Sequence, residues 1–208
     1  MHATVRTGFY PLTPICSQVN KSMQVVTQEV KKEKTPTLHS KWSNRFIWAA
    51  IVQGLFATLL TIPIVLPWLN PPVSKVIASG SAGTWFLAGY VMYIMVGVIA
   101  VGLTALFYHH FEVVLGKRYT GVTRYFAWIH LAPMNVGAAG ATWMLMYAGY
   151  LGERALMPAA QGGLGWTALH VHEQILAPFV NPIGAMLVVT AIGVFAGGIG
   201  FLVTYLKR

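Results

Sequence analysis

Four apolar stretches dominate the sequence, and each is long enough to cross a lipid bilayer as a helix. They cover residues 46–68, 85–111, 125–150 and 182–205. Because a helix rises about 1.5 Å per residue and the hydrocarbon core is about 30 Å thick, about 20 apolar residues suffice for one crossing. Charged residues make up only 9% of the chain, against about 25% in soluble domains. The sequence therefore predicts an all-α integral membrane four-helix bundle and excludes a water-soluble globular fold.

Lysine and arginine residues beside these stretches predict the orientation of the chain. One side of the predicted bundle collects Lys41, Arg45, Lys117, Arg118, Arg124, Lys207 and Arg208. The other side has only Lys75 and Arg154. Because cytoplasmic loops carry the excess of lysine and arginine, we expect both termini in the cytoplasm and the chain in the plasma (inner) membrane. The net charge of +9 does not indicate nucleic acid, since these basic residues flank apolar spans, where they contact anionic lipid.

The first 40 residues differ in composition from the rest of the chain. They are polar, contain several prolines and a basic run at residues 31–34, and show no helical or strand periodicity. We expect a disordered basic cytoplasmic tail at residues 1–40, followed by the transmembrane domain at residues 41–208. Residues 8–20 lack the apolar run of a cleaved secretory signal, and either Met1 or Met23 could be the start. The single Cys16 excludes an intrachain disulfide and a cysteine-based zinc or iron–sulfur site.

Histidines near the predicted cytoplasmic ends of the second and third spans are the main candidates for chemistry. Ionisable side chains within a span are costly, and for that reason they often serve a function. At about 1.5 Å per residue, His109 lies about 12 Å from Lys117 along its helix, and His130 lies about 9 Å from Arg124. A short loop makes the two spans antiparallel neighbours, so we expect the two histidines to share a depth in the membrane.

Each of these histidines begins a stripe of mostly small residues at helical spacing. The stripes are His130 with Met134, Gly137 and Ala141, and His109 with Ala105 and Gly102. Two imidazoles from adjacent helices can clamp a haem where small residues leave room for it. The sequence thus offers His109 and His130 as axial ligands of haem b, with His110 as a substitute for His109. Close helix packing with hydrogen-bonded histidines is one alternative. Contact with a quinone or another metal is a second.

Three further features are candidates for chemistry or assembly. Glu112, beside the histidines, could relay protons or could pair with the basic loop. In the predicted outer loop, residues 151–181, three side chains could hold a metal or could lie on an amphipathic helix at the membrane surface. They are His170, His172 and Glu173. The fourth span contains two pairs of small residues four apart, Gly193 with Gly197 and Ala196 with Gly200. Such pairs favour close helix packing, and we therefore expect partner subunits.

A short motif in the third span resembles a known family of membrane oxidoreductases. The segment His-Leu-Ala-Pro-Met-Asn-Val-Gly at residues 130–137 follows a helix that ends in Tyr108-His109-His110. Over residues 85–150 this pattern resembles the haem-binding subunits of haem–copper oxidases and nitric oxide reductases, in which such a histidine lies in a haem-bearing bundle. The chain departs from their catalytic subunits, because it has far fewer spans and lacks the histidines that would hold copper beside the haem. The resemblance therefore implies an accessory or cytochrome-like subunit.

Two functions follow as expectations from these observations. The first is a transmembrane subunit of a respiratory-type oxidoreductase complex, with haem b between spans two and three. The alternative is a non-catalytic structural subunit that scaffolds a larger membrane enzyme, such as a respiratory oxidase or a copper-dependent membrane monooxygenase, and binds only lipid. The sequence contains no P-loop, dinucleotide-binding glycine motif, HExxH motif or Ser-His-Asp arrangement, so we do not expect a self-contained hydrolase or pump. A transporter is disfavoured because the spans lack buried carboxylates and matched broken helices.

Overall fold

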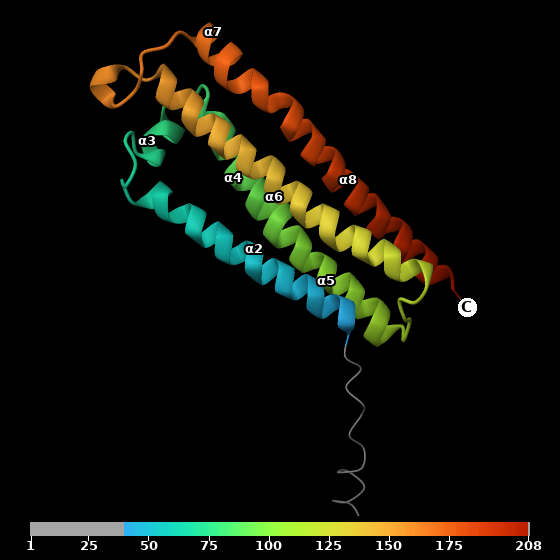
Figure 1. Cartoon of the computed structure of the whole chain (residues 1–208). Helices are drawn as coiled ribbons and strands as arrows, with labels where there is room; N and C mark the ends of the chain where they lie inside the picture. The colour runs from blue at the N-terminus through green and yellow to red at the C-terminus, as the bar shows by residue number, and fades with distance from the viewer. Residues whose placement is uncertain (1–39, 208) are drawn as a thin grey trace, which may run out of the picture. The chain divides into compact units, whose positions relative to one another are not determined.

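The computed structural model describes residues 40–207, which form a bundle of long helical segments (Figure 1). The predicted tail therefore lies, except for Ser40, outside the described residues. Four long segments run beside one another and are joined by short connections. The long segments are α2 (Lys41–Val65), the continuous run of α4 (Gly83–Met92), η1 (Tyr93–Ala100), α5 (Val101–His109) and η2 (His110–Val114), then α6 (Val122–Leu156), and finally the run of α7 (Ala168–Val171), η4 (His172–Leu176) and α8 (Ala177–Leu206). Two short helices, α3 (Val73–Ala78) and η3 (Ala159–Gln161), lie in the connections.

Three of the four long segments are long and apolar enough to cross a membrane. They are Lys41–Val65, Gly83–Val114 and Ala168–Leu206. The prediction of an all-helical, multi-pass membrane protein is therefore confirmed for the fold and for three of its long segments. The fourth segment, α6, is 35 residues long but less apolar, and it packs against α8 and α4. Its buried face is made largely of alanine and glycine, which fit between closely packed helices.

Glycines set the close spacing of α6 to its neighbours. A Cβ atom at Gly149 of α6 would lie 2.3 Å from the backbone nitrogen of Phe86 on α4. On α8, a Cβ at Gly193 would lie 2.5 Å from the backbone nitrogen of Met134. Of the small residues of the fourth span, Gly193, Ala196, Gly197 and Gly200 are buried in the structure, which confirms close helix packing there, whereas Gly184 and Gly198 are not buried. Helices that approach at backbone distance gain many dispersion contacts, which is the main source of helix association in lipid.

Residues 151–181, predicted as an outer loop that could carry an amphipathic helix, are largely helical. Helix α6 continues to Leu156, and the last long segment begins at Ala168 and joins α8 without a break (Figure 1). The predicted fourth span begins at Pro182, and that residue lies inside the longer helix α8. Proline costs a helix one backbone hydrogen bond, and long apolar helices packed against neighbours tolerate that loss. The helix starts where Thr167 caps it, with the Thr167 side chain accepting a hydrogen bond from the His170 backbone N–H at 3.3 Å.

Candidate functional site

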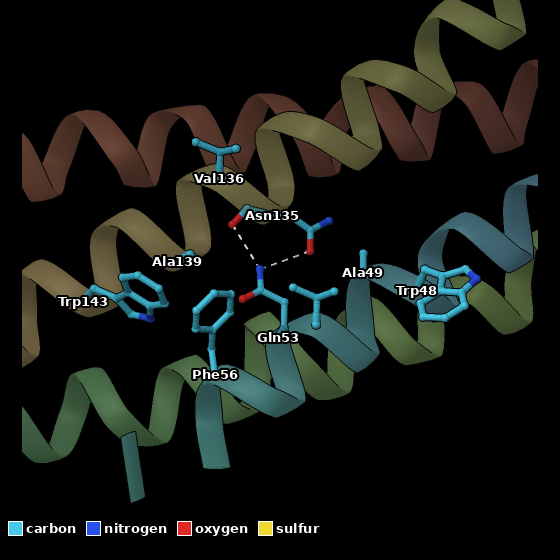
Figure 2. A pocket seen from close by; sticks show the side chains of 9 residues that line it. Trp48, Ala49, Gln53, Phe56, Asn135, Val136, Ala139 and Trp143 are labelled. Atoms are coloured by element: carbon cyan, nitrogen blue, oxygen red, sulfur yellow. Dashed lines mark hydrogen bonds between the residues drawn. The ribbon is translucent and has the colours of Figure 1, made fainter. Parts of the chain in front are cut away.

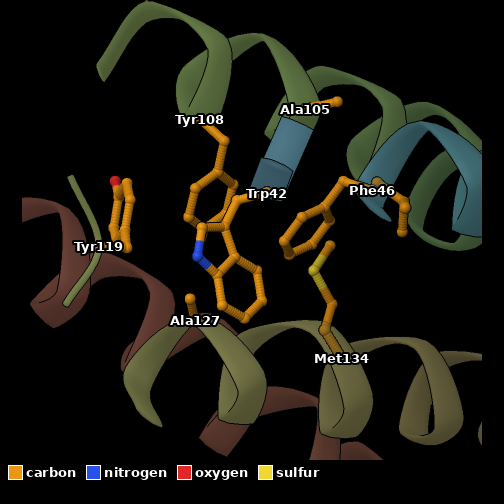
Figure 3. Close-up of a cluster of buried hydrophobic side chains, with 8 residues drawn as sticks. Trp42, Phe46, Ala105, Tyr108, Tyr119, Ala127 and Met134 are labelled. Carbon is orange, nitrogen blue, oxygen red and sulfur yellow. The ribbon is translucent and has the colours of Figure 1, made fainter. Parts of the chain in front are cut away.

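His130 lies in an aromatic cluster at the end of the bundle where α2 and α6 begin and α8 ends; we call this the basic end. The imidazole is 4% exposed. Its Nδ1 atom lies 3.2 Å from the Tyr108 hydroxyl, within hydrogen-bonding distance. The rings of Phe46 and Phe201 lie 5.1 and 5.7 Å from it, centroid to centroid. Figure 3 shows the buried apolar side chains of this cluster, in which Tyr108 stacks on Phe46 at 4.8 Å.

The His130 ring also lies directly on the backbone of α8. A Cβ atom at Gly197 would stand 2.2 Å from Nδ1 and 2.3 Å from Cε1 of the imidazole. The glycine therefore provides the space that the ring occupies. With Phe46 from α2, Tyr108 from α5 and Phe201 from α8, His130 joins all four long segments. The arrangement is that of a polar side chain that locks helices together.

The other two candidate histidines do not point into the bundle. His109 and His110 are exposed, and the inward position of that turn belongs to Tyr108, which is fully buried. Successive residues on a helix are turned by about 100°, so a difference of one residue decides which side chain faces the core. The structure therefore does not bring His109 or His110 together with His130. The pattern of Val101, Ala105 and Tyr108 at helical spacing could have revealed Tyr108 as the inward residue.

Two glutamates each bind the beginning of a neighbouring helix. Glu112 accepts hydrogen bonds from the Ser40 hydroxyl and from the Trp42 backbone N–H, the latter at 3.1 Å, in the first turn of α2. Glu153, 4% exposed, accepts one from the backbone N–H of Gly83 at 3.2 Å, where α4 begins. Free N–H groups and the helix dipole make a helix N-terminus a favourable place for a carboxylate. Glu112 thus holds a helix terminus, a role we had not expected, and sequence reasoning missed Glu153.

A polar network lies in the middle of the bundle, in the floor of a groove between α2 and α6. Tyr93 donates its hydroxyl proton to the side-chain oxygen of Gln53. The Gln53 amide lies 3.3 Å from the Asn135 side-chain oxygen and 3.4 Å from its backbone oxygen (Figure 2). Asn135 in turn donates to the backbone oxygen of Leu131 at 2.7 Å. These amides therefore pair within the chain and join α2, η1 and α6.

The predicted outer metal ligands lie on the surface of the last long segment. His170, His172 and Glu173 are exposed, and the ring of His170 packs edge-on against Trp166 with the centroids 4.4 Å apart. Within residues 40–207, no three histidine, cysteine or acidic side chains are grouped so that they could hold a metal ion. The alternative prediction, that these three residues lie on a helix, agrees with the structure. That helix is continuous with α8 and is not a separate element.

The site residues of this chain thus connect helices to one another. His130 contacts Tyr108 on α5, and Glu153 contacts Gly83 on α4. Gln53 of α2 contacts Asn135 of α6, which also donates to Leu131 in its own helix. Such contacts stabilise a bundle, because a buried polar group without a hydrogen-bond partner costs about 1–3 kcal/mol of folding free energy in mutational measurements. Comparison with models of known protein families, with curated proteins and with solved structures finds no match for this chain.

Proposed function

We propose that this chain is a non-catalytic structural subunit of a larger membrane enzyme, and that it crosses the membrane four times. In this proposal α6 is the crossing that hydropathy alone does not identify, since it lies between the other three segments and runs beside them (Figure 1). Basic residues gather at one end of the bundle, and because cytoplasmic segments carry the excess of lysine and arginine, this supports both termini on the cytoplasmic side of the inner membrane. They are Lys41, Arg45, Lys117, Arg118, Arg124 and Lys207.

A stripe of small residues on the outward face of α8 is the observation that carries this proposal. Ala177, Gly184, Ala191 and Gly198 recur every seven residues, and we call them the outer stripe. A Cβ atom at Gly184 or at Gly198 would meet nothing within 4 Å, so packing within this chain requires neither glycine. Small residues at this spacing allow a second helix to approach closely. The inward small residues of α8 are occupied by α6, which leaves the outer stripe for a helix of another subunit.

The length of the last segment gives the proposal a second support. Ala168–Leu206 has 39 residues, and at 1.5 Å per residue it is about 58 Å long, against about 30 Å of hydrocarbon. Its first part carries exposed polar side chains, which indicates that it extends out of the membrane. These are His170, His172, Glu173, Gln174 and Asn181. A subunit of the same complex can contact this extension outside the lipid.

We expect a substitution in the outer stripe to separate this chain from its complex. Ala191→Leu places a bulky side chain where a partner helix would approach, whereas Ala185→Leu makes the same change on α8 outside the stripe. On native gels of membranes that express the full chain, wild type and Ala185→Leu should migrate within a large complex, and Ala191→Leu should migrate mostly as the free subunit. Migration of the wild type as a monomer, or an intact complex with Ala191→Leu, would contradict the proposal.

The environment of His130 favours the structural subunit over a haem-binding one. One ring nitrogen already faces Tyr108, and the ring rests on Gly197. An axial ligand needs a free nitrogen with space for a flat macrocycle beside it, and aromatic side chains fill that space. Membership of an oxidoreductase complex is supported only by the resemblance of residues 85–150.

We therefore expect no haem signal from this chain. A reduced-minus-oxidised visible spectrum of the purified, folded protein should lack a b-type band, and His130→Ala should leave the spectrum unchanged while lowering the thermal midpoint. A b-type band that disappears in His130→Ala but persists in His110→Ala would instead establish a redox subunit with His130 as a ligand.

A further inference from the structure

The groove between α2 and α6 has an apolar lining and opens on the outer surface of the bundle. Its volume is about 390 Å³. The lining side chains are mostly aromatic or aliphatic, with the two paired amides in the floor (Figure 2). Trp48, Val52 and Phe56 of α2 form one wall and are 60%, 46% and 41% exposed. Residues of α6, from Asn135 to Trp143, form the other wall. Apolar side chains this exposed face lipid in a membrane bundle, so the groove is accessible from the bilayer.

A stacked arginine stands at the end of this groove nearest the basic end. The guanidinium of Arg45 lies 4.4 Å from the ring of Trp42 on α2 and 4.7 Å from the ring of Trp128 on α6. Arg45 thus spans the two helices that form the groove. On α2 it precedes Trp48 and Ala49, the first lining residues, by one turn of the same face. The stacking holds its planar head between α2 and α6, one helical turn before the first lining residues of the groove.

Two further cations lie on the same faces. Lys41 precedes Arg45 by one turn on α2, and Arg124 precedes Trp128 by one turn on α6, and both are exposed. The nearby carboxylate, Glu112, is bound to Ser40 and to the Trp42 backbone. Positive charge from both helices therefore lies on the side of the groove towards the basic end, and the lining of the groove itself is mostly apolar.

We infer that this groove is a binding site for an anionic glycerophospholipid. Its phosphate would lie at Arg45, because a guanidinium binds phosphate oxygens in two parallel hydrogen bonds and tryptophan rings prefer the headgroup level. One acyl chain lies along Trp48, Val52 and Phe56 towards Trp143. Clusters of lysine and arginine beside a span attract acidic headgroups, and the apolar groove adds contact for the chain. Charge at one end and an apolar lining along the rest match the two parts of such a lipid.

The groove fits a quinone less well, although both ligands are lipid-soluble. A quinone needs a donor for its carbonyl oxygens, and in the floor the Gln53 amide and one of the two Asn135 amide hydrogens are already engaged. Gln53 donates to Asn135 and accepts from Tyr93, while Asn135 donates to Leu131. Breaking this network would leave buried polar atoms unpaired, which costs about 1–3 kcal/mol each. A phospholipid needs no hydrogen-bond donor in the floor of the groove, because its polar headgroup lies at the end nearest Arg45.

Native mass spectrometry of the full chain, delipidated in detergent, tests this inference. The probes are phosphatidylglycerol and phosphatidylcholine with the same acyl chains, each added at equal concentration. The wild type should retain phosphatidylglycerol preferentially. Arg45→Gln should lower its retention about tenfold, the effect of one lost charge-assisted hydrogen bond, whereas Arg118→Gln, a surface charge in the loop after η2, should not.

A second pair of variants tests the groove without changing any charge. Ala139→Leu fills the lining, while Ala185→Leu makes the same change at an exposed position of α8 outside the outer stripe. We expect phosphatidylglycerol retention to fall in Ala139→Leu and to remain at the wild-type level in Ala185→Leu, with both variants keeping the wild-type thermal midpoint. Equal retention of the two lipids, no retention of either, unchanged retention in Arg45→Gln and Ala139→Leu, or displacement of the lipid by ubiquinone would overturn the inference.

Discussion

Gly193→Ala is expected to destabilise the bundle by about 3 kcal/mol, at the upper end of the cost of overpacking. The added methyl would lie 2.5 Å from the backbone nitrogen and 2.9 Å from the Cα of Met134 on α6. Because both atoms belong to a helix backbone, no side-chain rotation can relieve the clash, and α6 and α8 must move apart. For a chain of this length such a loss lowers the thermal midpoint by about 6–12 °C. Tryptophan fluorescence of the purified chain during heating measures it.

The same helix supplies a matched control for this substitution. Gly198→Ala is the same chemical change on the outward face, where the added methyl meets nothing within 4 Å. Alanine is the better helix former by about 0.5–1 kcal/mol, so the midpoint should stay constant or rise slightly. Equal losses in the two variants would show that α6 and α8 do not pack as the structure places them.

Glu153→Ala is the second substitution for which we expect a large loss, about 1–3 kcal/mol. The buried carboxylate accepts a hydrogen bond from the Gly83 backbone N–H at 3.2 Å, at the N-terminus of α4, and alanine would remove this charge-assisted bond and leave only the bond from the same N–H to the Gly80 carbonyl. The favourable interaction of a negative charge with the helix dipole would also disappear. Amide hydrogen exchange should therefore accelerate in the first turn of α4 while the basic end of the bundle keeps its protection.

An exposed glutamate on the last long segment provides the comparison. Glu173→Ala removes the same group from an exposed position, and we expect less than about 0.5 kcal/mol of change, as for most surface substitutions. Glu153→Gln retains an acceptor for the Gly83 N–H and should fall between the wild type and Glu153→Ala. If Glu153→Ala and Glu173→Ala behaved alike, Glu153 would not hold the start of α4.

The candidate site shows how far helical spacing can be followed from the sequence. His130 was placed on a face with Met134, Gly137 and Ala141, and all four are buried together in the structure. His109 was placed inward by the same argument, yet its neighbour Tyr108 holds that position. Gly102, Ala105 and His109 all lie in α5, and the pattern of Val101, Ala105 and Tyr108 in the same helix fits helical spacing equally well. The packing of α5 against α2 decides between the two patterns and buries Tyr108.

The sequence by itself determined the class of this protein. Long apolar stretches without charge are stable only in lipid or in a large apolar core. In lipid the backbone hydrogen bonds of such a stretch must be made within a helix, so composition and length predict an all-helical membrane protein. Only the tertiary structure decided which polar side chains form hydrogen bonds between helices and which surfaces of the bundle are exposed. The pairing of Glu153 with Gly83, the place of His130 on Gly197, and the groove below Arg45 each join residues distant in the sequence. Such contacts depend on how helices rotate and pack against one another, which local periodicity does not contain.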